Sequence, residues 1–278
     1  MTDATTVTSE TSIKDVLQKM QSNFIKYIVV QENNKPVGIV TERDVNKFLE
    51  NDKTARALEE ISIEQVMQKN LITLPDDADN RVNQAAKDMN VFKVGSIILI
   101  DSNGHLTELI TKTDITKIYG AVYGAKFKVK DYMSRKVITC RKSDSLRFAL
   151  NMINQNDVSR LVVTNNDGKP LGVITTNTFL THSSYFTKNN GDTREYLLPT
   201  DSKNMCVGDL ASKDLLTVNL EDDLSVAAQK MVKNRINGIP VTDNDDQLVG
   251  MVSSLDVLKA FVKVPLTGEL LQKYSEFY

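Results

Sequence analysis

The stretch YIVVQENNKPVGIVTERDV, from Tyr27 to Val45, contains two apolar runs on either side of a polar, asparagine-rich cluster. The second run ends at Thr41, and Asp44 follows three positions later. Two apolar runs around such a cluster are typical of a β-hairpin, and a hydroxyl residue followed by an acid is typical of a helix start. The stretch therefore predicts a strand, a turn, a second strand and a helix.

The same pattern occurs three more times along the chain. The other copies are IILIDSNGHLTELITKTDI (Ile97 to Ile115), LVVTNNDGKPLGVITTNTF (Leu161 to Phe179) and IPVTDNDDQLVGMVSSLDV (Ile239 to Val257). In every copy an apolar residue stands 12 positions before the hydroxyl residue, and these pairs are Val29 and Thr41, Leu99 and Thr111, Val163 and Thr175, and Val241 and Ser253. A unit this small cannot bury its apolar face alone, so the copies must pack on one another.

A short β-rich stretch and a helical segment precede the hairpins, so the unit is β-α-β-β-α and the fold class is α/β. The helical segments include Ser12 to Met20, Ser145 to Ile153 and Leu224 to Val232. We expect residues 1–122 to form a first pair of repeats, at about 5–50 and 62–120. Residues 123–278 form a second pair, at about 129–182 and 207–262, with a surface insertion at 183–206. The amphipathic segment from Gly268 to Tyr278 predicts a C-terminal helix that docks on its own chain or on a dimer mate.

Composition limits the possible functions. The chain has 278 residues, of which 41% are hydrophobic and 25% charged, and a net charge of −2, so no overall basic field indicates nucleic acid. Its first residues, MTDATTVTSE, lack the pattern of a signal peptide, and no apolar run is long enough to span a membrane, so we expect a cytoplasmic protein. The cysteines, Cys140 and Cys206, and the histidines, His105 and His182, are too scattered to predict a metal site or a catalytic pair. We therefore expect no enzyme activity and no bound metal.

The repeated unit with a G-x-x-[ST]-x-x-D junction resembles the CBS domain, and the four copies cover almost the whole chain. The resemblance implies that the repeats pair into two Bateman modules, which associate as a disc. It also implies that the clefts between paired repeats bind adenosine-containing ligands such as AMP, ADP, ATP or S-adenosylmethionine. We therefore expect a stand-alone, ligand-sensing regulatory protein that takes an adenine nucleotide and acts on a separate, unidentified protein partner.

Copies one and four keep every residue of the junction. These residues are Gly38, Thr41 and Asp44 in copy one and Gly250, Ser253 and Asp256 in copy four. The glycine would let a flat base approach the strand, the helix start would attract a phosphate, and the acid would accept hydrogen bonds from ribose hydroxyls. The hydroxyl and the acid could equally form a capping box that only stabilises the helix start. The two roles are compatible.

Copies two and three lack one junction residue each. In copy two Glu108 replaces the glycine, while Thr111 and Asp114 remain. In copy three Gly172 and Thr175 remain, but Thr178 takes the place of the acid. If copy one pairs with copy two and copy three with copy four, each module has one complete junction, so we expect about one nucleotide per module.

Phosphate contacts are harder to predict from sequence. Lys26 and Arg160 stand at the same distance before Val29 and Val163, and either could reach a phosphate or be an edge-strand charge that discourages aggregation. In copy four Arg235 is the nearest cation, and Ile239 and Pro240 resemble the family's apolar base-contacting segment.

A local basic stretch, AKFKVKDYMSRKVITCRK, lies between the two pairs, and its cations are Lys126, Lys128, Lys130, Arg135, Lys136, Arg141 and Lys142. It is either a solvated linker or a contact for RNA. An RNA- or ribosome-associated factor is therefore the alternative function.

Overall fold

The computed structural model describes residues 4–52, 54, 56–182, 198, 202–264 and 266–277. Within them the chain forms one three-stranded sheet per repeat, and each hairpin is followed by a helix. Repeat 1 consists of β1 (Thr6–Val7), α1 (Ile13–Asn23), β2 (Tyr27–Glu32), β3 (Lys35–Thr41) and α2 (Glu42–Asn51). Repeat 2 consists of β4 (Thr73–Pro75), α3 (Arg81–Phe92), β5 (Ser96–Ile100), β6 (Leu106–Thr111) and α4 (Lys112–Val122).

The second half of the chain repeats this order. Repeat 3 consists of β7 (Thr139–Arg141), α6 (Leu146–Gln155), β8 (Arg160–Thr164), β9 (Pro170–Thr175) and α7 (Thr176–His182). Repeat 4 consists of β10 (Val218–Asn219), α9 (Leu224–Lys233), β11 (Gly238–Thr242), β12 (Leu248–Ser253) and α10 (Ser254–Lys263). The short helices α5 (Val129–Tyr132) and α8 (Val207–Leu210) lead into repeats 3 and 4, and α11 (Gly268–Phe277) ends the described chain.

The predicted hairpins are all present. In each sheet the short first strand is parallel to the first hairpin strand, and the two hairpin strands are antiparallel. In repeat 1, for example, Ile28 pairs with Val40 and Val30 with Gly38. The predicted helical segments are also confirmed as α1, α6 and α9. Ser12 and Ser145 cap the first two, because their side chains accept from the backbone N–H three positions later.

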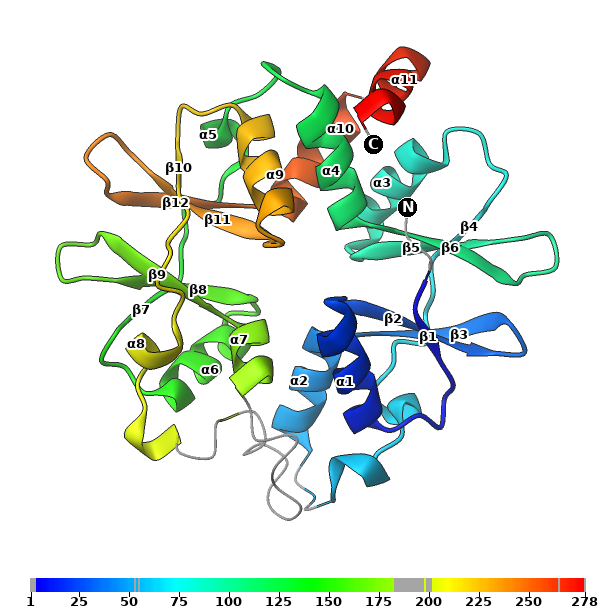
Figure 1. Cartoon of the computed structure of the whole chain (residues 1–278), viewed down its shortest axis with the longest axis horizontal. Coiled ribbons are helices and arrows are strands. Elements are labelled where there is room, and N and C mark those ends of the chain that lie inside the picture. Colours follow the sequence, from blue (N-terminus) through cyan, green and yellow to red (C-terminus); the bar gives the residue numbers. More distant parts are fainter. Residues whose placement is uncertain are drawn as a thin grey trace.

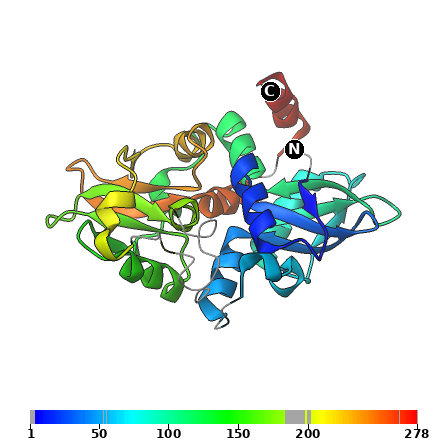
Figure 2. The ribbon, with the colours of Figure 1, turned by 60° about the horizontal axis from the view of Figure 1, so that its bottom comes forward.

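The four repeats surround the middle of a disc, with the hairpin tips at its rim (Figure 1). Repeats 1 and 2 form one half and repeats 3 and 4 the other, as the second view also shows (Figure 2). Because the hairpins point outward, their open ends and the starts of the following helices turn toward the middle of the disc (Figure 1). The junctions that the sequence singled out therefore lie around this centre.

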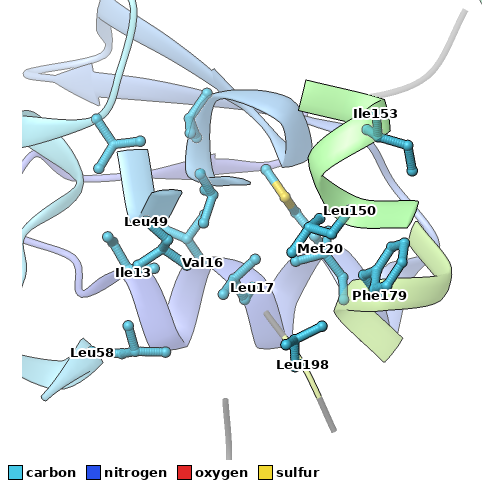
Figure 3. Packing of buried hydrophobic residues seen from close by; sticks show 14 of the residues in the cluster. Ile13, Val16, Leu17, Met20, Leu49, Leu58, Leu150, Ile153, Phe179 and Leu198 are labelled. Carbon is cyan, nitrogen blue, oxygen red and sulfur yellow. The ribbon is translucent and has the colours of Figure 1, made fainter. Parts of the chain in front are cut away.

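Two apolar cores join the halves of the disc. One combines buried residues of repeats 1 and 3, and the other combines residues of repeats 2 and 4. In the first core Val16 and Met20 of α1 lie near Leu150 of α6 and Phe179 of α7 (Figure 3). Full burial of each such side chain is worth about 1.5–3 kcal/mol. The expectation that the copies pack on one another is thus confirmed, and the two halves bury apolar faces against each other.

Within the first half, a small apolar cluster of Val29, Ile98 and Leu109 joins the sheets of repeats 1 and 2. The C-terminal helix packs on its own chain, since Leu270 and Tyr274 contact the core of repeats 2 and 4.

The predicted surface insertion falls largely outside the described residues. Of its middle part Leu198 is described, and it is buried in the core of repeats 1 and 3. Met205, near the end of the insertion, packs against the same core. The insertion therefore contributes apolar side chains to the core, which its polar composition did not predict.

Candidate nucleotide site

The hydroxyl residues of the junctions cap the helices that follow them. Thr41, Thr111 and Ser253 each form a capping box with the acid three positions later. In repeat 1 the Thr41 backbone N–H donates to Asp44 Oδ2 at 2.9 Å, and the Thr41 hydroxyl donates to the same oxygen at 2.5 Å. The corresponding hydroxyl distances to Asp114 and Asp256 are 2.6 and 2.7 Å. The capping interpretation is therefore confirmed, and it uses one carboxylate oxygen of each acid.

Repeat 3 builds the same helix start without an acid. The Thr175 backbone N–H donates to Thr178 Oγ1 at 3.2 Å, and the two hydroxyls lie 3.1 Å apart. A neutral hydroxyl thus replaces the carboxylate in the cap. It offers no charged acceptor for a ribose.

The junction glycines make room for another part of the protein. A Cβ on Gly38 would lie 2.2 Å from Met67 Sδ, and one on Gly250 would lie 2.6 Å from Met133 Sδ. On Gly172 it would lie 2.5 Å from the carbonyl oxygen of Ser212. These neighbours belong to the segments that precede the paired repeats. The space beside each glycine, which was expected to admit a nucleotide base, is thus filled by these protein atoms.

Glu108 stands where the other copies have this glycine. Its carboxylate is half-buried and lies 3.5 Å from the guanidinium of Arg81 at the start of α3. An ion pair therefore occupies the region of the second junction.

The spacing that placed Lys26 and Arg160 at equivalent positions of their repeats was wrong by one residue. Strand pairing sets Tyr27 opposite Thr41, whereas Arg160 lies opposite Thr175. The reason is the turn of the first hairpin, in which Asn33 and Asn34 both have positive φ, 50° and 64°. This two-residue turn shortens the first hairpin by one residue relative to the others, whose turns are longer.

Lys26 and Arg160 nevertheless come together near the middle of the disc. Burial lowers the pKa of Lys26, Glu42 opposes this shift, and the charge of Arg160 lowers the pKa further. Burial also lowers the pKa of Arg160 to about 10. The Arg160 guanidinium donates to the carbonyl oxygen of Gly238 at 2.9 Å and so crosses from repeat 3 to repeat 4. The two expected phosphate contacts therefore share one environment, although they come from different positions of their repeats.

A third half-buried cation, which was not expected from the sequence, is Lys112, the first residue of α4. Burial lowers its pKa, and the nearby charge of Arg43 lowers it further. The Lys112 backbone N–H donates to the carbonyl oxygen of Gly95, and Gly95 lies against the ring of Tyr27, the residue after Lys26. We call Lys26, Lys112 and Arg160 the central cation cluster. Among the described residues none of the three forms a salt bridge.

One carboxylate lies beside this cluster. Burial raises the pKa of Glu42, while Lys26 and a hydrogen bond from Asn177 oppose the shift. The Asn177 amide donates to Glu42 at 2.8 Å, which joins α7 of repeat 3 to α2 of repeat 1. Arg43, the next residue, forms an ion pair with Asp157. The sequence could not predict these contacts because they join distant repeats.

The other residues predicted for the nucleotide have different surroundings. The guanidinium of Arg235 lies 5.5 Å from the ring centre of Phe24, so this cation stacks on an aromatic residue of repeat 1. Ile239 is fully buried in the core of repeats 2 and 4, which takes its side chain away from a base. Pro240 is buried as the next residue of β11 and points to the opposite face of the strand.

An open hollow of about 410 Å³ lies between α2 and the segment Gln65–Gln68. Asp44, Phe48 and Arg56 are among its lining residues. Pockets for small ligands usually have about 300–1,000 Å³. Copy one thus has both an acid and space beside it.

The basic stretch between the pairs is partly neutralised. The ammonium groups of Lys128 and Lys130 both bind the carboxylate of Glu221, at 2.8 and 2.7 Å. Arg135, Lys136 and the remaining cations of the stretch are exposed or nearly so. Two of its lysines therefore act within the fold.

The cysteines and histidines do not meet. Burial raises the pKa of the Cys140 thiol to about 12, which makes it a poor nucleophile. His105 contacts Asp101, and His182 contacts the carbonyl oxygen of Thr178. Within the described ranges no three acids, cysteines or histidines gather as metal ligands would. In the same ranges no helix is long and apolar enough to cross a bilayer.

Comparison with known proteins agrees with this architecture. The family model of the CBS domain matches residues 1–51, 63–121, 129–185 and 207–263. These ranges make up most of the chain, so the chain belongs to the CBS domain family.

Two relatives show how far the similarity extends. Protein MJ1225 of Methanocaldococcus jannaschii is 26% identical over 273 residues, covering 92% of this chain and 94% of that protein. Its crystal structure has a TM-score of 0.78 and covers 94% of this chain and 96% of that chain. A CBS domain-containing protein of Dictyostelium discoideum is 31% identical over 141 residues, which is 50% of this chain and 94% of that protein.

A third protein shares the fold alone. The crystal structure of a conserved protein from Pyrococcus horikoshii has a TM-score of 0.65 at 18% identity and covers 94% of this chain and 97% of that chain. The fold of the whole chain is thus shared with both solved structures.

Proposed function

We propose that this protein is a regulatory sensor that binds adenosine-containing nucleotides of the AMP, ADP and ATP class between its paired repeats. It acts in the cytoplasm, as a module pair or a homodimer, and transmits its state to a separate protein partner without turning the ligand over. The observation that carries the proposal is the central cation cluster, Lys26, Lys112 and Arg160, which repeats 1, 2 and 3 contribute to the middle of the disc.

Buried charges are costly unless a counter-charge lies close to them. Here three half-buried cations have lowered pKa values, and Glu42 is the acid that opposes this shift at Lys26. A phosphate group would supply the missing negative charge. Helix starts at the same place, such as that of α2, add free backbone N–H groups that favour anions.

The adenosine part would use the complete junctions. Asp44 and Asp256 each keep a second carboxylate oxygen that the cap does not use and that could accept from a ribose hydroxyl. Thr41 and Ser253 would stabilise the same helix starts, and Gly38 and Gly250 would hold the paired segments in place. Thr111, Asp114 and Thr175 belong to junctions in which Glu108 or Thr178 departs from the full set, so about one nucleotide per module remains our expectation.

Similarity supports the regulatory role. MJ1225, which matches this chain over nearly its full length, is described as a candidate archaeal homologue of γ-AMPK. We carry over to this chain only the idea of a regulatory subunit. The partner on which it acts stays unidentified.

A thermal-shift panel tests the proposal. AMP, ADP, ATP, S-adenosylmethionine and GTP are compared on the wild type and on Lys112→Met, with Lys136→Met as the control because Lys136 is exposed and lies away from the centre. A ligand at about 100 times its dissociation constant stabilises by about 2.7 kcal/mol. We expect adenine nucleotides to stabilise the wild type and Lys136→Met, and Lys112→Met to lose much of the gain.

The same panel decides against the proposal if no adenine nucleotide raises the melting temperature of the wild type. RNA binding is then the next candidate, carried by the exposed cations of residues 126–142. RNA binding would fall steeply with added salt because phosphate contacts release counterions.

A further inference from the structure

The two complete junctions differ in the donor that binds the second carboxylate oxygen of the acid, the one that the helix cap does not use. In repeat 1, Asp44 Oδ1 accepts from the neutral side-chain amide of Gln68 at 3.0 Å. In repeat 4, Asp256 Oδ1 accepts from the ammonium group of Lys259 at 3.0 Å. Each acid is therefore occupied at the oxygen that a ribose would need, but by groups of different charge.

The sequence explains the difference once the strands are superimposed. Gln68 and Ser134 have the same place in their modules, because each exchanges backbone hydrogen bonds with the outer hairpin strand of the paired repeat, at Ile39 and Met251. The long side chain of Gln68 reaches Asp44. Ser134 is short, and its hydroxyl donates to the carbonyl oxygen of Lys136 at 3.2 Å instead.

The helices themselves do not cause the difference. Lys47 in α2 and Lys259 in α10 both stand three residues after the acid of the junction. Only Lys259 binds its acid through an ion pair, since in repeat 1 the second oxygen of Asp44 accepts from Gln68. The residue before the paired repeat therefore decides which donor holds the acid.

We propose that Lys259 is a specificity-determining residue that competes with the ribose hydroxyls for Asp256, so that the first junction is the stronger site for a ribonucleotide and the fourth the weaker. The inference rests on the proposed function and refines it.

The relative strength follows from charge and burial. Gln68 is exposed, so its amide can return to water when a hydroxyl replaces it as a neutral donor to Asp44. Asp256 is only 6% exposed, and removing the ammonium group leaves its buried carboxylate without a counter-charge. Displacing the existing donor therefore costs a ribose more free energy at Asp256 than at Asp44.

Calorimetric titration with ADP tests this order. The wild type should show two binding events of unequal affinity, and Asp44→Ala should remove the stronger one. Lys259→Met should tighten the weaker event about fivefold, which corresponds to about 1 kcal/mol for a partly buried ion pair, and should leave the stronger event unchanged. The gain should disappear with 2′,3′-dideoxyadenosine diphosphate, which lacks both hydroxyls.

Lys47→Met is the matched control, because it removes a lysine from the same helical position without freeing a carboxylate oxygen. It should tighten neither event; because Lys47 lines the hollow beside Asp44, any effect should be a weakening of the stronger event. The inference is overturned if Lys259→Met leaves the weaker event unchanged or weakens it, or if Asp44→Ala removes the weaker event. Absence of any ADP binding to the wild type would instead refute the proposed function, and the inference with it.

Discussion

Replacing Arg160 by methionine should stabilise the free protein and weaken nucleotide binding at the same time. Burial lowers the pKa of Arg160 from 12.5 to about 10, so the folded state holds a charged group that it disfavours. At about 1.36 kcal/mol per pKa unit, this burial costs about 3 kcal/mol at neutral pH. Methionine keeps the apolar length of the side chain and removes that cost.

Part of this gain in stability is offset, because the substitution also removes a hydrogen bond. The Arg160 guanidinium donates to the Gly238 carbonyl oxygen at 2.9 Å, and a hydrogen bond to a charged donor contributes about 1.5–3 kcal/mol. The net change in the free energy of unfolding is therefore a gain of about 1 kcal/mol. Such a gain with loss of function is common where a binding site holds unfavourable charges.

Urea denaturation of the free protein and calorimetric titration with ADP measure the two effects. We expect a higher urea midpoint for Arg160→Met and an affinity for ADP reduced at least about tenfold, as loss of one charged contact implies. Arg135→Met, at an exposed position of the basic stretch, serves as the control and should change neither quantity. A lower midpoint together with unchanged affinity would refute the reasoning, because Arg160 would then be a structural cation.

Three other changes probe the fold and the centre of the disc. Gly38→Ala should lower the free energy of unfolding by about 1–3 kcal/mol, because its Cβ would lie 2.2 Å from Met67 Sδ; chemical denaturation measures this. Tyr119→Phe should raise it by about 1–2 kcal/mol in the same assay, because the buried hydroxyl has no hydrogen-bond partner among the described residues. Raising the pH toward the ordinary lysine pKa of 10.5 should weaken stabilisation by inorganic phosphate, because Lys26 and Lys112 have lowered pKa values and lose their protons first.

In the free protein, by contrast, raising the pH increases the contribution of these lysines to stability. Between the lowered pKa values and the ordinary lysine value, the unfolded chain binds more protons than the folded one, so the contribution of Lys26 and Lys112 to stability rises with pH. A phosphate effect that is constant across this range would contradict the role of the central cation cluster.

Gly124→Ala, where a Cβ would meet no atom within 4 Å, is the control for Gly38→Ala and should be nearly neutral.

The hairpins and helix starts could be predicted from sequence because their signals are local. Alternating apolar runs around Asn33 and Asn34 specify a hairpin, and Thr41 with Asp44 specifies the start of the next helix. The same local method misplaced Lys26 by one residue, because spacing counted from the hydroxyl residue does not reveal that one turn is shorter than the others.

The centre of the disc could not be predicted in this way. Lys112 is an ordinary charged residue at the start of a helix, and only the packing of the repeats buries it near the charge of Arg43. The partners of the acids, Gln68 and Lys259, were also missed. Gln68 is 24 residues from Asp44 in the chain, and a lysine at the position of Lys259 has a counterpart, Lys47, that leaves its acid to another donor.

The most direct measurement for the central claim is the stoichiometry of ADP binding in the wild type and in the double variant Asp44→Ala, Asp256→Ala. The account predicts saturable binding of about two nucleotides per wild-type chain, one per module, and affinity reduced at least about tenfold at both sites in the double variant. Circular dichroism should show that the double variant stays folded, since it loses about 1 kcal/mol for each weakened helix start. Absence of saturable ADP binding in the wild type, or equal affinity and stoichiometry in both proteins, would contradict the account.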